Sequence, residues 1–128
     1  MNILLDTHVL LWWQADDPRL TEAARSIIAD PSNRLVWSVA SSWEIAVKIG
    51  IGKLRLGGPL NRLYSDIVSE VGAELLPITH VHCCRLATLP LLHRDPFDRM
   101  LVAQAQAEEL PILSADPKLA MYEVRTVN

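Results

Sequence analysis

Short apolar segments alternate with stretches of helical periodicity along this chain, and that alternation restricts the fold more than any other feature. The segments expected as strands are 2–5, 35–39, 74–78, 111–113 and 124–127. The segments expected as helices are 20–29, 41–49, 60–71, 80–86 and 97–109, with a further short helix opening at Asp116-Pro117. Strands that alternate with helices predict an α/β fold: a three-layer sandwich in which a mostly parallel central sheet of about four to five short strands is flanked by helices.

Length and composition indicate one globular domain spanning residues 1–128. Half of the residues are apolar and 21% are charged, which excludes a disordered tail and a coiled coil. No apolar run approaches the ~20 residues that span a bilayer, and the N-terminus lacks the basic stretch of a signal peptide. The two cysteines, Cys83 and Cys84, are adjacent and form no disulfide framework. We therefore expect a reduced cytoplasmic protein that makes no membrane contact.

Acidic residues lie just beyond the ends of the expected strands. Asp6 ends the first strand, Asp116 follows the strand at 111–113, and Glu44 lies in the first turn of the helix after the second strand. Asp98 opens the helix that leads into a neighbouring strand. Parallel α/β sheets place their sites beyond the carboxyl ends of the strands, so we expect these four carboxylates to share one pocket.

Four carboxylates in one small pocket raise one another's pKa, and a hard divalent cation resolves the conflict. Mg²⁺ or Mn²⁺ takes oxygen ligands, keeps several waters and bridges to substrate phosphates. A metal held by carboxylates next to a phosphate predicts metal-assisted hydrolysis of phosphodiesters by an activated water.

Several of the acids also have a structural interpretation as helix caps, whereas Asp6, at the end of a buried apolar strand, does not. Glu44 would close a capping box with Ser41, and Asp95 before Pro96 is a typical N-cap arrangement, which Asp116 repeats before Pro117. Capping is the better explanation for Asp95 and Asp116 taken singly. Because a helix N-terminus also keeps a carboxylate ionised, the two interpretations can coexist, and the joint pattern favours a site.

Four motifs occur along the chain in a recognisable order: Ile3-Leu-Leu-Asp6-Thr7, Ser41-Ser-Trp-Glu44, Asp98-Arg-Met-Leu-Val-Ala-Gln-Ala105 and Ile112-Leu-Ser-Ala-Asp116. This ordered set resembles PIN domains over essentially the whole chain, and most closely the VapC-type ribonuclease toxins of bacterial toxin–antitoxin pairs. The resemblance implies a PIN-like fold and an endoribonuclease that depends on Mg²⁺ or Mn²⁺. It also implies two protein partners, a cognate antitoxin that docks over the acidic groove and a second copy of the chain in a homodimer.

The resemblance assigns roles to individual residues. The catalytic quartet is Asp6, Glu44, Asp98 and Asp116, and the metal ligands among them are Asp6, Asp98 and Asp116. Thr7 and Ser114 match hydroxyl positions that support the site, and Asp95 is expected to act as a cap with a supporting role. Lys118 stands where many relatives carry a further acid, which weakens the case for a second metal.

Basic residues near the expected site are candidates for binding the RNA backbone. They are Lys48, Lys53, Arg55 and Arg99, and ordinary surface charge explains them about as well. The formal net charge of −3 excludes a purely electrostatic RNA binder, but setting the quartet aside as a metal-neutralised cluster changes it to +1.

Two further clusters have mainly structural interpretations. The segment His80-Val-His82-Cys83-Cys84 lacks zinc-site spacing, and only His80 and Cys84 share a helical face. Trp37 is expected in the core, whereas the pair Trp12-Trp13 fits either the core or a protein interface.

Three alternative functions stay open at this point. A phosphatase of the haloacid dehalogenase type would need an acid at the position of His8, and a receiver-type signalling domain would need a late lysine at a strand end. A catalytically silent PIN-like module that only binds a partner is the third. Cleavage of RNA that Mg²⁺ or Mn²⁺ stimulates and a chelator abolishes would distinguish the nuclease from the silent module, whereas incorporation of label from a small phosphodonor would indicate the receiver.

Overall fold

The computed structural model describes residues 1–128 as a five-stranded, all-parallel sheet with the strand order β3-β2-β1-β4-β5. The strands are β1 (Asn2–Leu5), β2 (Arg34–Ser38), β3 (Glu74–Leu76), β4 (Ile112–Leu113) and β5 (Thr126–Val127). The helices are α1 (Thr7–Ala15), α2 (Glu22–Ala29), α3 (Val39–Gly50), α4 (Leu60–Val71), α5 (His80–Thr88), α6 (Pro96–Glu108) and the short 3₁₀ helix η1 (Leu119–Met121). The predicted α/β sandwich with a parallel sheet is confirmed.

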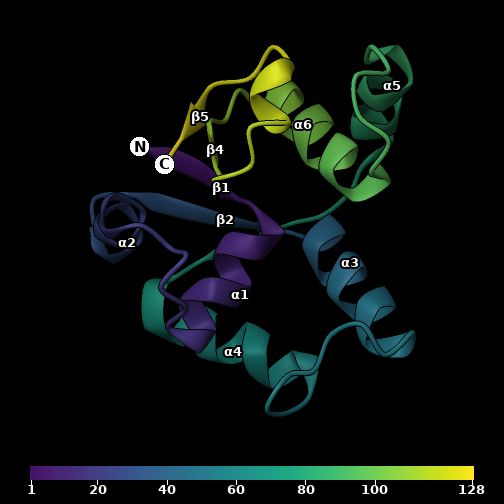
Figure 1. Ribbon diagram of the computed structural model, residues 1–128. Helices are drawn as coiled ribbons and strands as arrows, with labels where there is room; N and C mark the ends of the chain where they lie inside the picture. Colours follow the sequence, from purple (N-terminus) through teal and green to yellow (C-terminus); the bar gives the residue numbers. More distant parts are fainter.

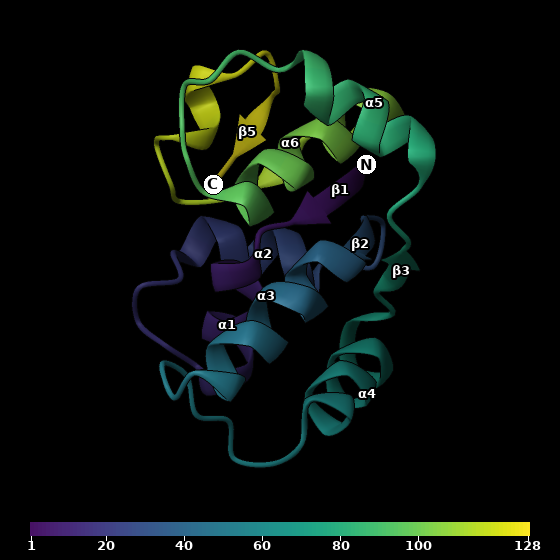
Figure 2. The ribbon, with the colours of Figure 1, turned by 90° about the vertical axis from the view of Figure 1, so that its right-hand side faces the viewer.

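The sheet is covered on both faces, and β1 shows why. Its side chains alternate, so that Ile3 and Leu5 join one buried cluster whereas Leu4 joins the other. The first cluster includes apolar residues of α1, α2 and α4, and the second is built mainly on α6 with η1 and the end of α5. Figures 1 and 2 show these two groups of helices on opposite sides of the strands. Burial of both faces explains the nearly continuous apolar character of the strands.

Strand β1 lies at the centre of the sheet, where the direction of the chain reverses. The chain passes from β1 to β2 and β3 on one side, then returns through α5 and α6 to β4 on the other side of β1. A crevice opens at such a reversal, beyond the carboxyl ends of the two strands. Asp6 begins the segment after β1, and its backbone N–H donates to the carbonyl of Leu113 at the end of β4. The fold therefore places Asp6 at the switch point.

Two local predictions were wrong. Helix α1 was not predicted, because its apolar residues from Val9 to Trp13 are contiguous and show no helical period. Helix α3 begins at Val39, and its N-cap is Ser38, whose hydroxyl accepts from the N–H of Ala40. Glu44 therefore lies in the second turn of α3 and closes no capping box with Ser41.

None of the helices is both long and apolar enough to cross a membrane.

Candidate metal centre

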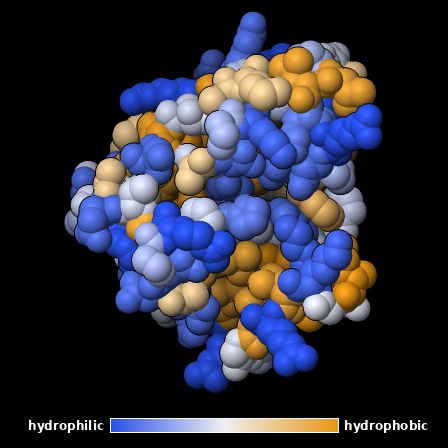
Figure 3. Space-filling view, viewed as in Figure 1, coloured by the Kyte–Doolittle hydropathy of each residue, from blue (hydrophilic) through white to orange (hydrophobic).

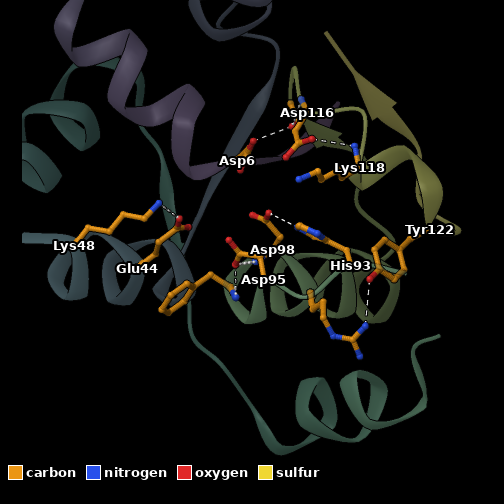
Figure 4. Close-up of polar contacts among 12 residues, drawn as sticks. Asp6, Glu44, Lys48, His93, Asp95, Asp98, Asp116, Lys118 and Tyr122 are labelled. Atoms are coloured by element: carbon orange, nitrogen blue, oxygen red, sulfur yellow. Dashed lines mark hydrogen bonds and ion pairs between the residues drawn. The ribbon is translucent and has the colours of Figure 1, made fainter. Parts of the chain in front are cut away.

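The four predicted carboxylates come from four separate parts of the fold and face a common space (Figure 4). Asp6 follows β1, Glu44 lies on α3, Asp98 is in the first turn of α6, and Asp116 lies on the loop after β4. Three of them are buried, with exposed fractions of 2% for Asp6, 1% for Glu44 and 8% for Asp98. Asp116 is partly exposed at the rim. The structure thus brings together the acids that the spacing singled out.

One oxygen of Asp6 is fixed and the other is free. Its Oδ2 accepts a hydrogen bond of 2.8 Å from Ser114 Oγ, which in turn accepts from the N–H of Asp116 at 3.0 Å. Its Oδ1 is buried and has no hydrogen-bond partner. A buried carboxylate oxygen without a donor is costly, so this atom marks a place where a ligand fits.

Glu44 repeats this arrangement on the opposite side of the space. Lys48 Nζ lies 2.6 Å from Glu44 Oε2, an ion pair between residues one helical turn apart on α3. The second oxygen, Oε1, is buried without a partner. Two buried carboxylates with one orphaned oxygen each form an oxygen-rich donor set suited to a hard divalent cation.

Asp98 is held between a histidine and a helix cap. His93 Nε2 lies 2.9 Å from Asp98 Oδ2. Asp95 caps α6 through Oδ1, which accepts from the N–H groups of Phe97 and Asp98 at 2.9 and 3.1 Å, so its predicted capping role is confirmed. Ligand atoms of His93, Asp95 and Asp98 lie within 4.8 Å of one another, close enough to contribute to a single metal site.

Burial and mutual repulsion make the ionised cluster unfavourable without a cation. The pKa of Asp98 is raised to about 6, mainly by burial; the hydrogen bond to His93 opposes the rise, and the charges of Asp95, Asp6 and Glu44 add to it. Burial also raises the pKa of Asp6, against the hydrogen bond from Ser114. For Lys48, desolvation lowers the pKa, but the ion pair with Glu44 and the charges of Asp95 and Asp98 together raise it above its ordinary value. A divalent cation would relieve the repulsion among these carboxylates, and the residues present therefore fit such an ion.

Of the two hydroxyls predicted to support the site, that of Ser114 contacts a member of the quartet and that of Thr7 contacts α3. Ser114 orients Asp6, and Thr7 Oγ1 forms a buried hydrogen bond of 2.8 Å with Ser41 Oγ, which ties the start of α1 to α3. Asp116 Oδ1 accepts from the N–H of Lys118 at 2.9 Å, so Asp116 stabilises its own turn while its carboxylate stays at the rim. No local pattern in the sequence indicates that Ser41 is the partner of Thr7.

Three of the four predicted RNA-binding residues line one groove of about 460 Å³ beside the acids. Lys48, Lys53 and Arg55 lie along it with Trp12 and with Arg19, whose guanidinium carbon is 5.0 Å from the Trp12 ring centre. Figure 3 shows a hollow with an apolar floor and a hydrophilic border on this face, between the regions of α1 and α3. The sequence did not predict Arg19 as a groove residue, because Arg19 and Lys53 lie far apart in the chain although they line the same groove.

Arg99 lies apart from that groove. Its Nη1 donates to the carbonyl of Pro90 at 2.9 Å and to the hydroxyl of Tyr122 at 3.2 Å. The structure therefore shows Arg99 holding the loop before α6 rather than lining the groove with the other three.

The other clusters are placed as expected. His80 Nε2 and Cys84 Sγ are 3.5 Å apart on the exposed face of α5, whereas His82 is fully buried against Glu108. Trp37 is fully buried in the core, as predicted.

Residues 3–125 match the family model described as "PIN domain". Over 94% of its length, the chain is 26% identical to ribonuclease VapC22 of Mycobacterium tuberculosis, and the match covers 92% of that protein. A 35% identical match to ribonuclease VapC16 of the same organism covers 51% of this chain and 49% of that protein.

Solved structures share the fold. VapBC2 from Rickettsia felis bound to a promoter DNA fragment gives a TM-score of 0.74 at 14% identity and covers 100% of this chain and 98% of the other. FitAcB from Neisseria gonorrhoeae gives a TM-score of 0.70 at 19% identity and covers 98% and 96%. Because the family model spans nearly all of the sequence, the chain belongs to the PIN-domain family.

Proposed function

We propose that this protein is a Mg²⁺- or Mn²⁺-dependent endoribonuclease and the toxin of a VapC-type toxin–antitoxin pair. The observation that carries the proposal is the pair of orphaned buried oxygens, Asp6 Oδ1 and Glu44 Oε1, in a cluster of acids at the switch point of the sheet. Two relatives named ribonuclease VapC support the choice of RNA as substrate. Membership of the PIN family argues against the phosphatase and receiver alternatives. The remaining alternative is the catalytically silent PIN-like module, which the test below must exclude.

Each acid of the quartet has a separate role in the proposed reaction. Asp6 and Asp98 would hold the cation, and Asp116 at the rim would complete its charge balance. A bound Mg²⁺ or Mn²⁺ would activate water for attack on the phosphodiester and offset the charge on the leaving oxygen. Glu44 would orient that water, because Lys48 fixes Oε2 and leaves Oε1 directed into the site. Ser114 keeps Asp6 in place throughout.

The groove beside the acids is the proposed path of the RNA backbone. Lys53 and Arg55 are exposed there, and Lys48 connects the groove to the acids through its ion pair with Glu44. Basic side chains along a groove attract phosphates without reading the sequence of the bases.

Two protein partners follow from the same proposal. Several solved structures with this fold are toxin–antitoxin complexes, which supports an antitoxin as partner. For the homodimer, α3 and its C-cap residue supply an exposed apolar face, since Trp43, Val47 and Ile51 are spaced one helical turn apart with exposed fractions of 52%, 38% and 61%.

Cleavage of a labelled RNA by the purified protein tests the proposal. We expect cleavage with Mg²⁺ or Mn²⁺, loss of cleavage with a chelator, and no cleavage by Asp6→Asn or Asp98→Asn. Asp66→Asn, an exposed acid on α4, is the matched control and should cleave normally. Metal-independent cleavage, or full activity of either site variant, would contradict the proposal. A folded wild-type protein that cleaves no RNA under any metal would favour the silent module.

A further inference from the structure

We propose that His93 is a positioning residue that holds the Asp98 carboxylate in the orientation needed to bind the divalent cation. The inference rests on the proposed function and adds to it a residue outside the acidic quartet.

The contact between the two side chains is direct and sheltered from solvent. His93 Nε2 and Asp98 Oδ2 are 2.9 Å apart, and each side chain is 12% exposed. An ionised carboxylate only accepts hydrogen bonds, so Nε2 carries the proton and donates. This hydrogen bond occupies one oxygen of Asp98, and Figure 4 shows the carboxylate between His93 and the other acids. The remaining oxygen is thereby left for the site.

The loop that carries His93 is fastened at both ends. At its start, Leu89 is buried in the core and the carbonyl of Pro90 accepts from Arg99 Nη1 at 2.9 Å. At its end, Asp95 caps α6 through two backbone N–H groups. Tyr122 accepts from the same Arg99 nitrogen at 3.2 Å and links the loop to the segment after η1. A loop held in this way restricts His93 to the neighbourhood of Asp98.

A direct metal-binding role for His93 is less consistent with the geometry. Its Nε2 is already engaged with Asp98 Oδ2 at 2.9 Å. Coordination through Nε2 would break this hydrogen bond. Hydrogen bonds to the ligands of a metal typically change its affinity by about 10- to 100-fold, so a positioning role predicts a measurable effect.

The test compares Mn²⁺ binding, measured by titration calorimetry, in the wild type, His93→Ala and His93→Gln. We expect His93→Ala to bind Mn²⁺ about 10- to 100-fold more weakly. His93→Gln should recover most of the affinity, because its amide nitrogen can occupy the place of Nε2 and donate to Asp98. His80→Ala removes an exposed histidine from α5 and should bind like the wild type.

Thermal unfolding of the metal-free variants separates positioning from a purely structural role. A structural role would lower the melting temperature of His93→Ala but leave the Mn²⁺ affinity of the folded protein unchanged, and that result would overturn the inference. Equal weakening in His93→Ala and His93→Gln would overturn it as well, because the donor would then be irrelevant. A wild type that binds no Mn²⁺ would overturn the proposed function itself, whereas normal wild-type binding with an unchanged His93→Ala would overturn only the positioning role.

Discussion

Asp6 and Ser114 are 108 residues apart in the chain, yet the hydroxyl of Ser114 donates a 2.8 Å hydrogen bond to the carboxylate of Asp6. The contact joins the carboxyl ends of β1 and β4, which are neighbours at the switch point of the sheet. Because Ser114 engages only Oδ2, the other oxygen of Asp6 is left unpaired toward the acidic cluster. The same serine also accepts from the N–H of Asp116, so one hydroxyl supports two members of the quartet.

Removal of that hydroxyl should weaken both the site and the fold. We expect Ser114→Ala to reduce Mn²⁺ affinity about tenfold or more, because Asp6 loses the contact that orients it. The free energy of unfolding should fall by about 1–3 kcal/mol, since a buried carboxylate oxygen loses its donor. Titration calorimetry and urea denaturation measure the two effects. Ser69→Ala, an exposed serine on α4, is the control and should change neither. Unchanged Mn²⁺ affinity in folded Ser114→Ala would refute the orienting role.

Neutralising Asp98 should stabilise the metal-free protein and eliminate its response to metal. Asp98 is buried among Asp6, Glu44 and Asp95, and its ionised form is disfavoured there. At pH 7 we expect Asp98→Asn to raise the free energy of unfolding by about 2 kcal/mol. This is less than the energy equivalent of the full pKa shift, because solvent partly screens the charge of Asp98. Thermal melts with and without Mn²⁺ check both parts, with Asp66→Asn as the exposed counterpart. A variant that is less stable than the wild type and still responds to Mn²⁺ would show that Asp98 is structural.

The raised pKa of Asp98 also predicts a pH dependence. Its pKa is about 6 in the folded protein against an ordinary value of 3.8, so between these values the folded state binds more protons than the unfolded state. Stability therefore falls as pH rises through this window, and the loss is complete above pH 6. Urea denaturation of the metal-free protein from pH 4 to pH 7 should show this decline, and the decline should be smaller in the Asp98→Asn variant, which keeps only the contribution of Asp6. Because protons and the cation compete for Asp98, Mn²⁺ should stabilise the wild type more at pH 7 than at pH 5. A constant metal effect over this range would contradict the prediction.

The sequence predicted the layers and the acidic quartet because both depend on local signals. An apolar run that ends at an acid, as at Asp6, predicts both a strand and the position of a site residue at the end of that strand. The start of α3 was placed too late because Ser41 resembles a cap, whereas the cap is Ser38, hidden at the end of a strand. The contact of His93 with Asp98 depends on the path of an irregular loop, and such a loop has no hydrophobic periodicity from which its path could be predicted. Contacts such as Ser114 with Asp6 and Thr7 with Ser41 arise from strand order, which a single sequence does not encode locally.

The groove beside the acids should account for much of the RNA affinity. In an Asp6→Asn background that prevents cleavage, we expect the double variant Lys53→Ala/Arg55→Ala to bind single-stranded RNA more weakly. The slope of log K against log salt concentration should decrease by roughly 1.4, because each lost contact with a single-strand phosphate contributes roughly 0.7. Fluorescence anisotropy over a salt series measures both quantities. The control is Arg85→Ala/Arg125→Ala, since these arginines line a separate groove with Pro111, at the amino ends of β4 and β5. An equal loss in both double variants would indicate general charge attraction, and an unchanged slope in Lys53→Ala/Arg55→Ala would exclude this groove as the RNA path.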